Sequence, residues 1–131
     1  EHSAPYSFRD FWRADSGMLA AMPVPAALGQ QDKPLSEMMA KYNRYAASGE
    51  INSRLDSAEA QADRTEAVVK AFADRAENVD RLDGVTVELK DGNWFNVRAS
   101  NTEPLLRLNV EADTQEAVDA LVKEILAIIR A

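Results

Sequence analysis

The second part of the chain alternates between two hydrophobic periods, one near two residues and one near 3.6. Four segments have an alternating pattern and are therefore predicted to be strands: residues 51–55, which form a short stretch, and residues 85–89, 94–99 and 105–111, where apolar side chains recur at every second position. Asp91-Gly92 lies between the second and third of these segments and is a strong signal for a tight hairpin turn. Residues 78–84 are expected to be extended chain leading into the second strand.

Two further segments of the same part have the helical period. The apolar positions of the first are Val68, Val69, Phe72 and Ala76, and those of the second are Val118, Leu121, Val122, Ile125 and Ile129. We expect Asp63 with Glu66 to cap the first helix, and Asp113 with Glu116 to cap the last one. The predicted order is β-α-β-β-β-α. Because each amphipathic helix needs an apolar surface to cover, we predict an α+β domain with a four-stranded antiparallel sheet and both helices on one face.

In residues 1–50, apolar residues recur at helical spacing in two separate stretches. Met18, Leu19 and Met22 predict a helix that ends near Met22, because Pro23 and Pro25 remove backbone donors. A second helix is expected from Pro34, through Leu35, Met38, Met39 and Tyr42, to a stop at Ala47-Ser48-Gly49. We place the linker between two structural units at Gly49.

An aromatic cluster, Phe8 with Phe11 and Trp12, stands near the start of the chain. Its density is typical of a core, or of a surface that a missing part of the chain would cover. The sequence begins without Met and without a signal-like segment, so we expect it to be cut from a longer protein.

Composition excludes several classes of protein. The chain has 131 residues, a net charge of -7 and no cysteine, so disulfide frameworks and thiolate chemistry are ruled out. The acidic balance argues against nucleic acid as a partner, and no apolar run is long enough to span a membrane. We expect a cytoplasmic protein.

Residues 98–104, Arg-Ala-Ser-Asn-Thr-Glu-Pro, are the segment with the most chemical content. Strand alternation points Arg98 and Arg107 to the face opposite the apolar side chains, near one turn. Ser100, Asn101 and Thr102 add hydroxyl and amide donors between them. Guanidinium groups match phosphate oxygens in a bidentate manner, so an oxyanion site is one interpretation. An ordinary polar hairpin turn is the other, because the same residue types are common in turns.

No catalytic or metal-ligating residue is assigned. His2 is the only histidine, which excludes a histidine-based metal site. Asp80 and Asp83 resemble a metal-binding pair, but turn and capping roles explain them better.

Two segments together carry a family resemblance. Glu1-His2-Ser3-Ala4 resembles the sugar-recognition loop of the α-D-phosphohexomutases, usually Gly-Glu-x-Ser-Gly/Ala-His, and residues 98–104 resemble the phosphate-binding loop of the same family. The loops occur in the family's order and are followed by the expected terminal helix. At the position of the family's histidine this chain has Pro5, which removes a polar group near the sugar.

The resemblance implies a specific fold and activity. It implies that residues 1–50 are the C-terminal piece of the third, α/β domain, and that residues 51–131 are the fourth domain, with a TATA-box-binding-protein-like sheet. It also implies a phosphomannomutase or phosphoglucomutase parent, which interconverts hexose 1-phosphate and hexose 6-phosphate through a hexose 1,6-bisphosphate. The phosphoserine loop and the Mg²⁺ site of such an enzyme belong to earlier domains. This segment alone is expected to be inactive.

Site residues and partners follow from the same resemblance. Glu1 and Ser3 would bind sugar hydroxyls, and Arg98, Ser100, Asn101 and Thr102 would bind the phosphate that is not transferred. Strand geometry adds Arg107 to the phosphate group. The partners would be a mannose or glucose phosphate and the missing N-terminal domains. His2 and the sequence of residues 8–11 look more like phosphomannomutases than phosphoglucosamine mutases. A non-catalytic phosphate-binding domain and a protein-interaction module that uses the exposed aromatics are the alternatives.

Overall fold

The computed structural model describes residues 5–131, and the chain divides into two compact units, Glu1–Arg44 and Tyr45–Ala131. Gly49, where the sequence suggested a linker, lies inside the second unit between two short strands. It has a φ of +67°, a backbone conformation that glycine adopts without steric cost.

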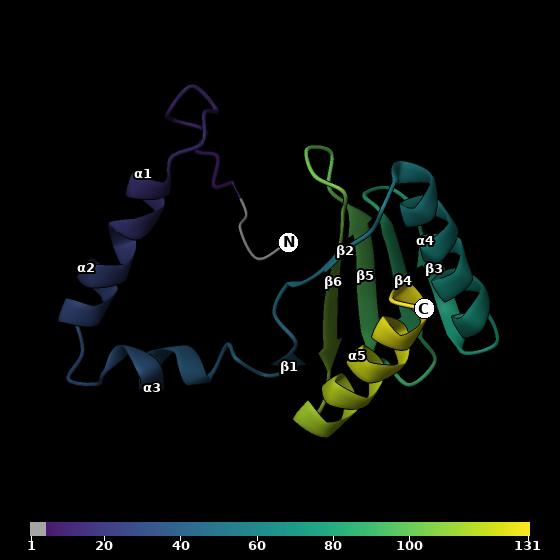
Figure 1. Ribbon diagram of the computed structural model, residues 1–131. Coiled ribbons are helices and arrows are strands. Elements are labelled where there is room, and N and C mark those ends of the chain that lie inside the picture. The colour runs from purple at the N-terminus through teal and green to yellow at the C-terminus, as the bar shows by residue number, and fades with distance from the viewer. Residues whose placement is uncertain (1–4) are drawn as a thin grey trace. The chain divides into compact units, whose positions relative to one another are not determined.

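The second unit is built on one antiparallel sheet (Figure 1). Its strands are β1 (Ala46–Ala47), β2 (Ile51–Arg54), β3 (Ala76–Asp80), β4 (Val85–Leu89), β5 (Trp94–Ala99) and β6 (Leu105–Ala112). The order is β1-β6-β5-β4-β3, and β2 also pairs with β6. Ala46 pairs with Ala112 and Ile51 with Leu108, so β1 and β2 follow one another along the same edge of β6.

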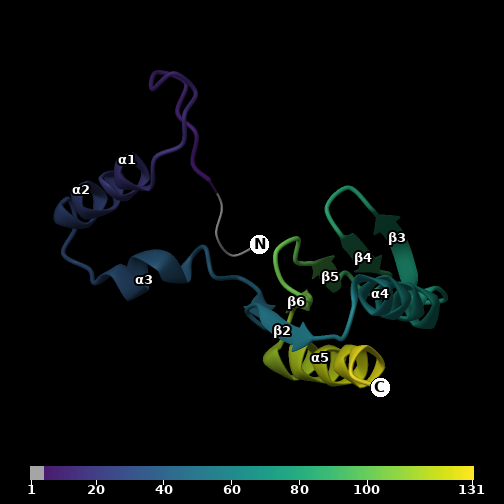
Figure 2. The same cartoon turned by 45° about the horizontal axis from the view of Figure 1, so that its top comes forward.

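Helices α4 (Ala58–Phe72) and α5 (Gln115–Ile129) cover one face of this sheet, as Figure 2 shows with the sheet seen nearly end-on. They are the longest helices between residues 5 and 131, and within that range no helix is long and apolar enough to cross a membrane. The opposite face of the sheet carries no helix of this unit.

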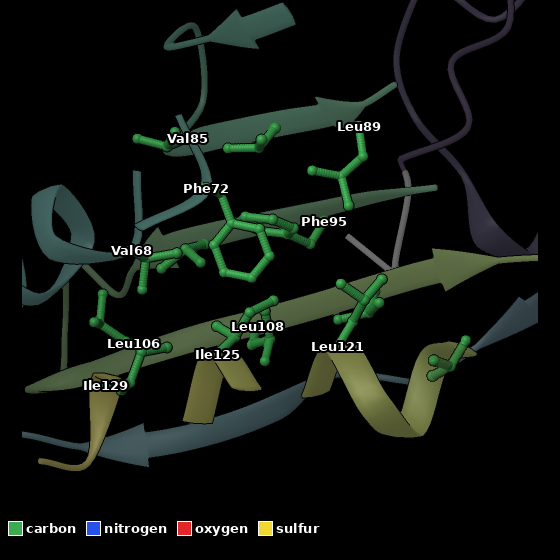
Figure 3. Close-up of a cluster of buried hydrophobic side chains, with 14 of the residues drawn as sticks. Val68, Phe72, Val85, Leu89, Phe95, Leu106, Leu108, Leu121, Ile125 and Ile129 are labelled. Carbon is green, nitrogen blue, oxygen red and sulfur yellow. The ribbon is translucent and has the colours of Figure 1, made fainter. Parts of the chain in front are cut away.

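The core lies between the sheet and the two helices (Figure 3). Its fully buried larger side chains come from α4, β4, β5, β6 and α5: Val68, Phe72, Val87, Phe95, Val97, Leu106, Leu108, Val110, Val118, Ile125 and Ile129. The rings of Phe72 and Phe95 meet edge to face with their centroids 4.9 Å apart. This contact links α4 directly to the centre of the sheet.

The predicted α+β class is confirmed, and all four predicted strands are present. The sheet has two strands more than the sequence indicated. β1 was expected to be part of a helix. β3 pairs with β4 along Val79 and Val87, and it begins at Ala76, which was wrongly predicted to lie on the first helix, since that helix ends at Phe72. Both additional strands lie at sheet edges, where backbone pairing rather than side-chain pattern decides the structure. The Asp91-Gly92 turn joins β4 to β5 as predicted, with Gly92 at a φ of +86°.

The predicted caps of both helices are wrong. The hydroxyl of Ser57 accepts from the backbone N–H of Ala60 at 3.1 Å and caps α4, so Asp63 lies inside the helix. Thr114 accepts from the backbone N–H of Ala117 at 3.2 Å and caps α5 in place of Asp113. A cap residue needs extended backbone immediately before the first turn, and Ser57 and Thr114 have it.

Between residues 5 and 44, the first unit has three short helices, α1 (Gly17–Ala21), α2 (Pro23–Gly29) and α3 (Leu35–Ala40). The first helix ends before Met22 as predicted, and Pro23 starts α2 because the first turn of a helix tolerates proline. The helix predicted from Pro34 to Ala47 is too long: it ends at Ala40. None of the side chains at positions 5–44 is buried.

Candidate anion site on the open face of the sheet

Two arginines stand side by side on the open face. Arg98 of β5 and Arg107 of β6 are direct cross-strand partners. Their neighbours along the strands, Val97, Leu106 and Leu108, are buried against the helices, so both arginines project to the other side. Their side chains are 25% and 27% exposed. Like charges directly opposite each other on a sheet are destabilising, so such a pair requires anions close by.

The loop after Arg98 is held at its base by three hydrogen bonds. The N–H of Ser100 donates to the carbonyl of Leu105 at 2.8 Å, and the same carbonyl accepts from Nε2 of buried Gln61 at 3.0 Å. The N–H of Leu55 donates to the carbonyl of Pro104 at 2.9 Å. The loop ends are therefore fixed by α4 and by the segment after β2, and the loop tip projects from the sheet.

The loop tip presents hydroxyl groups at close spacing. Oγ of Ser100 and Oγ1 of Thr102 are 3.4 Å apart, and the N–H of Thr102 points to Oγ of Ser100 at 3.4 Å. Asn101 and Thr102 are exposed. Hydroxyl hydrogens rotate freely, so these groups are able to donate to an anion that approaches the arginines.

The turn between β3 and β4 forms the opposite rim. Gly84 has a φ of +68°, and a Cβ there would lie 2.6 Å from the carbonyl oxygen of Val97 and 2.9 Å from Cα of Arg98. Only glycine allows this turn to lie so close to β5. The side chain of Asn96 donates to the carbonyl of Asp83 at 3.1 Å and fixes the turn from the sheet side.

An ion pair fixes the same turn from the helix side. Arg81 binds Glu66 of α4, with Nη2 and Oε2 3.0 Å apart. The hydrogen bond from Arg81 holds the pKa of Glu66 below its ordinary value of 4.5.

Carboxylates accompany both arginines. Asp83 Oδ2 lies 3.2 Å from Arg98 Nη1, and Glu50 Oε2 lies 3.8 Å from Arg107 Nη1. Nε of Arg107 is buried without a hydrogen-bond partner among residues 5–131. A buried, unpaired donor of a guanidinium is costly, and an anion with several oxygens would satisfy it.

These groups surround one open hollow of about 380 Å³. It is lined by Asp83, Gly84, Arg98, Ala99, Ser100, Asn101, Thr102 and Arg107. The structure thus brings together the five residues that the sequence analysis grouped as a phosphate site. Glu1 and Ser3, the expected sugar-binding residues, lie outside the described residues.

The two candidate metal ligands have other contacts. Asp80 accepts from the N–H of Leu82 at 2.8 Å, which is a turn contact, and Asp83 pairs with Arg98. Over residues 5–131, no cluster of three or more His, Cys, Asp or Glu side chains is suited to hold a metal ion.

Sequence reasoning missed Asp83, Gly84 and Gln61 as parts of this site. Gly84 could have been found from the pairing of the strands. Val85 pairs with Val97, which places Gly84, the residue before Val85, beside Arg98. Gln61 had no such signal, since its partner is a backbone carbonyl 44 positions away.

Comparison with known proteins assigns both parts of the chain. Residues 50–128 match the family model described as phosphoglucomutase/phosphomannomutase, C-terminal domain. Residues 1–45 match the model for alpha/beta/alpha domain III of the same enzymes. The chain belongs to the phosphoglucomutase/phosphomannomutase family. Its second unit carries the family's C-terminal domain, which contains the hollow described above.

Individual relatives agree with this family. The chain is 42% identical over 132 residues to a phosphomannomutase of Salmonella montevideo, covering 98% of this chain and 28% of that protein. It is 36% identical over 129 residues to a phosphomannomutase of Methanocaldococcus jannaschii, covering 98% and 27%. A probable phosphoglucosamine mutase of Methanopyrus kandleri is 34% identical, with 92% and 26% covered. The chain thus spans about a quarter of the length of the curated relatives it matches.

A solved structure supports the fold. The crystal structure of a phosphoglucomutase/phosphomannomutase family protein from Burkholderia thailandensis superposes with a TM-score of 0.67. The identity is 24%, over 97% of this chain and 27% of the other.

Proposed function

We propose that this chain is the C-terminal part of a phosphomannomutase or phosphoglucomutase and that its second unit binds the phosphate that is not being transferred. The observation that carries the proposal is the cross-strand pair Arg98 and Arg107 beside the donors of residues 100–102, at one open hollow. The parent enzyme would interconvert hexose 1-phosphate and hexose 6-phosphate through a hexose 1,6-bisphosphate.

The donor set fits a phosphate ester. Arg98 offers a planar guanidinium that matches two phosphate oxygens at once, and Ser100 and Thr102 are able to donate to the remaining lone pairs. Arg107 stands beside Arg98 and adds a second positive charge at the base of the hollow. Asn101, exposed at the tip, contributes an amide donor.

The contribution of this unit to the reaction is positional. Contacts to the remote phosphate supply binding energy that orients the reacting end of the sugar. Because a bisphosphate carries a similar group at each end, one phosphate site serves both orientations of the intermediate.

Sugar recognition and the chemical step belong to other parts of the parent protein. We propose that Glu1 and Ser3 bind sugar hydroxyls and that the phosphorylated serine and the Mg²⁺ site lie in the domains that precede this chain. Mg²⁺ would neutralise charge on the transferred phosphoryl group. Because the phosphorylated serine and the Mg²⁺ site would both lie outside this chain, we expect the isolated chain to be inactive.

The test is a titration of the isotopically labelled chain with mannose 6-phosphate and glucose 6-phosphate, followed by NMR at the amides of Ser100, Asn101 and Thr102. We expect saturable shifts confined to the hollow. Mutase activity of the isolated chain would contradict the assignment of the catalytic groups to other domains. Saturable shifts with inorganic phosphate of equal affinity would favour a general anion-binding domain over a sugar-phosphate site.

Arg98→Ala removes the main charge-assisted contact. It should weaken binding by about 1.5–3 kcal/mol, which is typical of a hydrogen bond to a charged group. Arg75→Ala is the matched control, because Arg75 pairs with Glu124 of α5 at 2.9 Å, remote from the hollow. Equal affinity for the Arg98→Ala variant and the unmodified chain would remove Arg98 from the site.

A second candidate function rests on the first unit. Trp12 is 86% exposed and Met18 is 82% exposed, which is unusual for side chains of this size. A protein-interaction module would use this surface. Sedimentation at several concentrations tests this candidate: self-association that Trp12→Ala abolishes would support it, and a strictly monomeric chain would argue against it.

A further inference from the structure

We propose that Asp83 limits the affinity of the hollow for doubly charged phosphate. Its carboxylate is a counter-ion of Arg98, and it either repels the bound phosphate or has to move away from Arg98 when the phosphate binds. The inference rests on the proposed function, because it concerns the same ligand class. It adds Asp83, which is neither among the residues that the family resemblance implies nor among the hydrogen-bond donors proposed for the phosphate.

Among residues 5–131, two carboxylates lie beside the two arginines of the hollow. Arg98 and Arg107 contribute two positive charges, and the carboxylates of Asp83 and Glu50 contribute two negative charges within 3.2 Å and 3.8 Å of them. A phosphate monoester is mostly doubly charged above its second pKa, near 6. Its arrival would leave these five groups with two excess negative charges.

The backbone of Asp83 is held close to Arg98. Gly84 fits against Val97 and Arg98 with no room for a Cβ, and Asn96 donates to the carbonyl of Asp83 at 3.1 Å. The carboxylate itself is less constrained, because the Asp83 side chain is 71% exposed. Ligand binding therefore has two routes: the carboxylate stays and repels the phosphate, or it swings into solvent and loses its pair with Arg98.

Both routes oppose binding, and both disappear when the charge of Asp83 is removed. Two unit charges about 4 Å apart interact by about 1 kcal/mol even at the dielectric of water. A carboxylate on the rim of the hollow is therefore sufficient to change affinity several-fold. A mutase needs such a limit, because one phosphate site has to release one end of the bisphosphate before it receives the other.

The alternative role for Asp83 is to position Arg98. The direction in which phosphate affinity changes when the carboxylate is removed distinguishes this role from that of a counter-ion. A positioning carboxylate would strengthen binding, so its loss would weaken it. A counter-ion weakens binding, so its loss would strengthen it. When the carboxylate stays beside the ligand, the counter-ion effect also scales with ligand charge, whereas a lost side-chain orientation affects singly and doubly charged ligands alike.

The experiment compares glucose 6-phosphate with glucose 6-sulfate, which carries a single negative charge, at pH 8 and low, constant ionic strength. NMR titrations of the full 131-residue chain give Kd from the amide shifts of residues 100–102. For Asp83→Asn we expect about tenfold tighter binding of the phosphate and about threefold tighter binding of the sulfate, since doubling the ligand charge doubles the repulsion energy. Glu50→Gln should act in the same direction with a smaller effect, because its pair with Arg107 is longer.

Asp91→Asn is the matched control for net charge. Asp91 lies in the turn before β5, whereas the hollow lies at the other end of that strand, beside Arg98 and Ala99, roughly 20 Å away at the usual rise per residue. It should leave both affinities unchanged. The same spectra report whether each variant keeps the fold.

Each other result overturns part of the account. Unchanged or weaker phosphate binding by Asp83→Asn, with Arg98→Ala weakening binding, would refute the counter-ion role and leave the proposed function intact. Equal gains for phosphate and sulfate would refute the route in which the carboxylate stays and would support the one in which it swings into solvent. If neither the unmodified chain nor Asp83→Asn shows saturable shifts, both the phosphate site and this inference fail together.

Discussion

The two units of this chain have similar helical patterns in sequence and opposite outcomes in structure. In the second unit, amphipathic helices α4 and α5 face a sheet, and side chains such as Phe72 and Ile125 are completely buried. In the first, the helices contain no buried residue, and Met22 and Met39 are 68% and 48% exposed. Periodicity thus marks which face of a helix is apolar, but burial requires a surface for that face to cover.

The largest difference between the units should appear on deletion of an aromatic ring. Phe95→Ala removes a fully buried side chain that meets Phe72, and should lower the free energy of unfolding by about 3–5 kcal/mol. Trp12→Ala removes a larger ring that is 86% exposed, and should change it by no more than about 0.5 kcal/mol. Urea unfolding followed by circular dichroism measures both. Comparable losses for the two variants would show that the first unit has a core of its own.

Helix caps provide a smaller test with the same chemistry in both units. Ser57 caps α4 and Ser16 caps α1, each accepting from a backbone N–H three residues on. Ser57→Ala should lower the free energy of unfolding by about 1 kcal/mol, because α4 is packed on the core. Ser16→Ala should leave it unchanged, since a five-residue helix without buried side chains adds nothing to the cooperative transition. Equal effects in urea unfolding would break the contrast.

Acid should weaken the second unit through Glu66. The hydrogen bond from Arg81 lowers the pKa of Glu66 from its ordinary value of 4.5, so the folded state binds this proton less readily than the unfolded state. The stability that Glu66 contributes is therefore present above pH 4.5 and is lost as the pH falls through its lower, folded-state pKa. Both partners are exposed, so the effect should be small.

Glu66→Gln isolates this contribution. Unfolding midpoints of the variant and the unmodified chain should differ at pH 6 and converge below the folded-state pKa of Glu66. Glu37→Gln is the control in the first unit, where Glu37 stands 4.0 Å from Lys33, and it should leave the curve unchanged. A midpoint difference for Glu66→Gln that persists undiminished at low pH would contradict the assignment.

Removal of the whole first unit should have the smallest effect on the free energy of unfolding. A chain of residues 45–131 alone should unfold within about 0.5 kcal/mol of the full chain, because its core is contained within that range. Residues 1–44 alone should show little helix by circular dichroism, since isolated helices this short are marginal in water. A large loss of stability on truncation would show that the first unit supports the second.

Local patterns predicted most of the second unit and the group of polar residues on its open face. Alternation along 94–99 and 105–111 identified both the buried side chains and the outward direction of Arg98 and Arg107, because neighbouring strand residues point to opposite faces. Helix starts were less predictable: a carboxylate three residues after an Asp resembles a capping box in many places, and only the backbone shows which one is used.

What the chain's own pattern settles is the class of the fold, the strands that alternate and the donors that stand between Arg98 and Arg107. These depend on neighbours along the chain, which the order of residues specifies directly. Tertiary structure alone decides that β1 and β3 complete the sheet edges, that Gln61 fixes the loop, and that Asp83 stands 3.2 Å from Arg98. The contacts of β1, Gln61 and Asp83 join residues distant in sequence, so their energy exists only after the sheet has brought them together, and β3 pairs with its neighbour β4 along an edge that no apolar pattern marks.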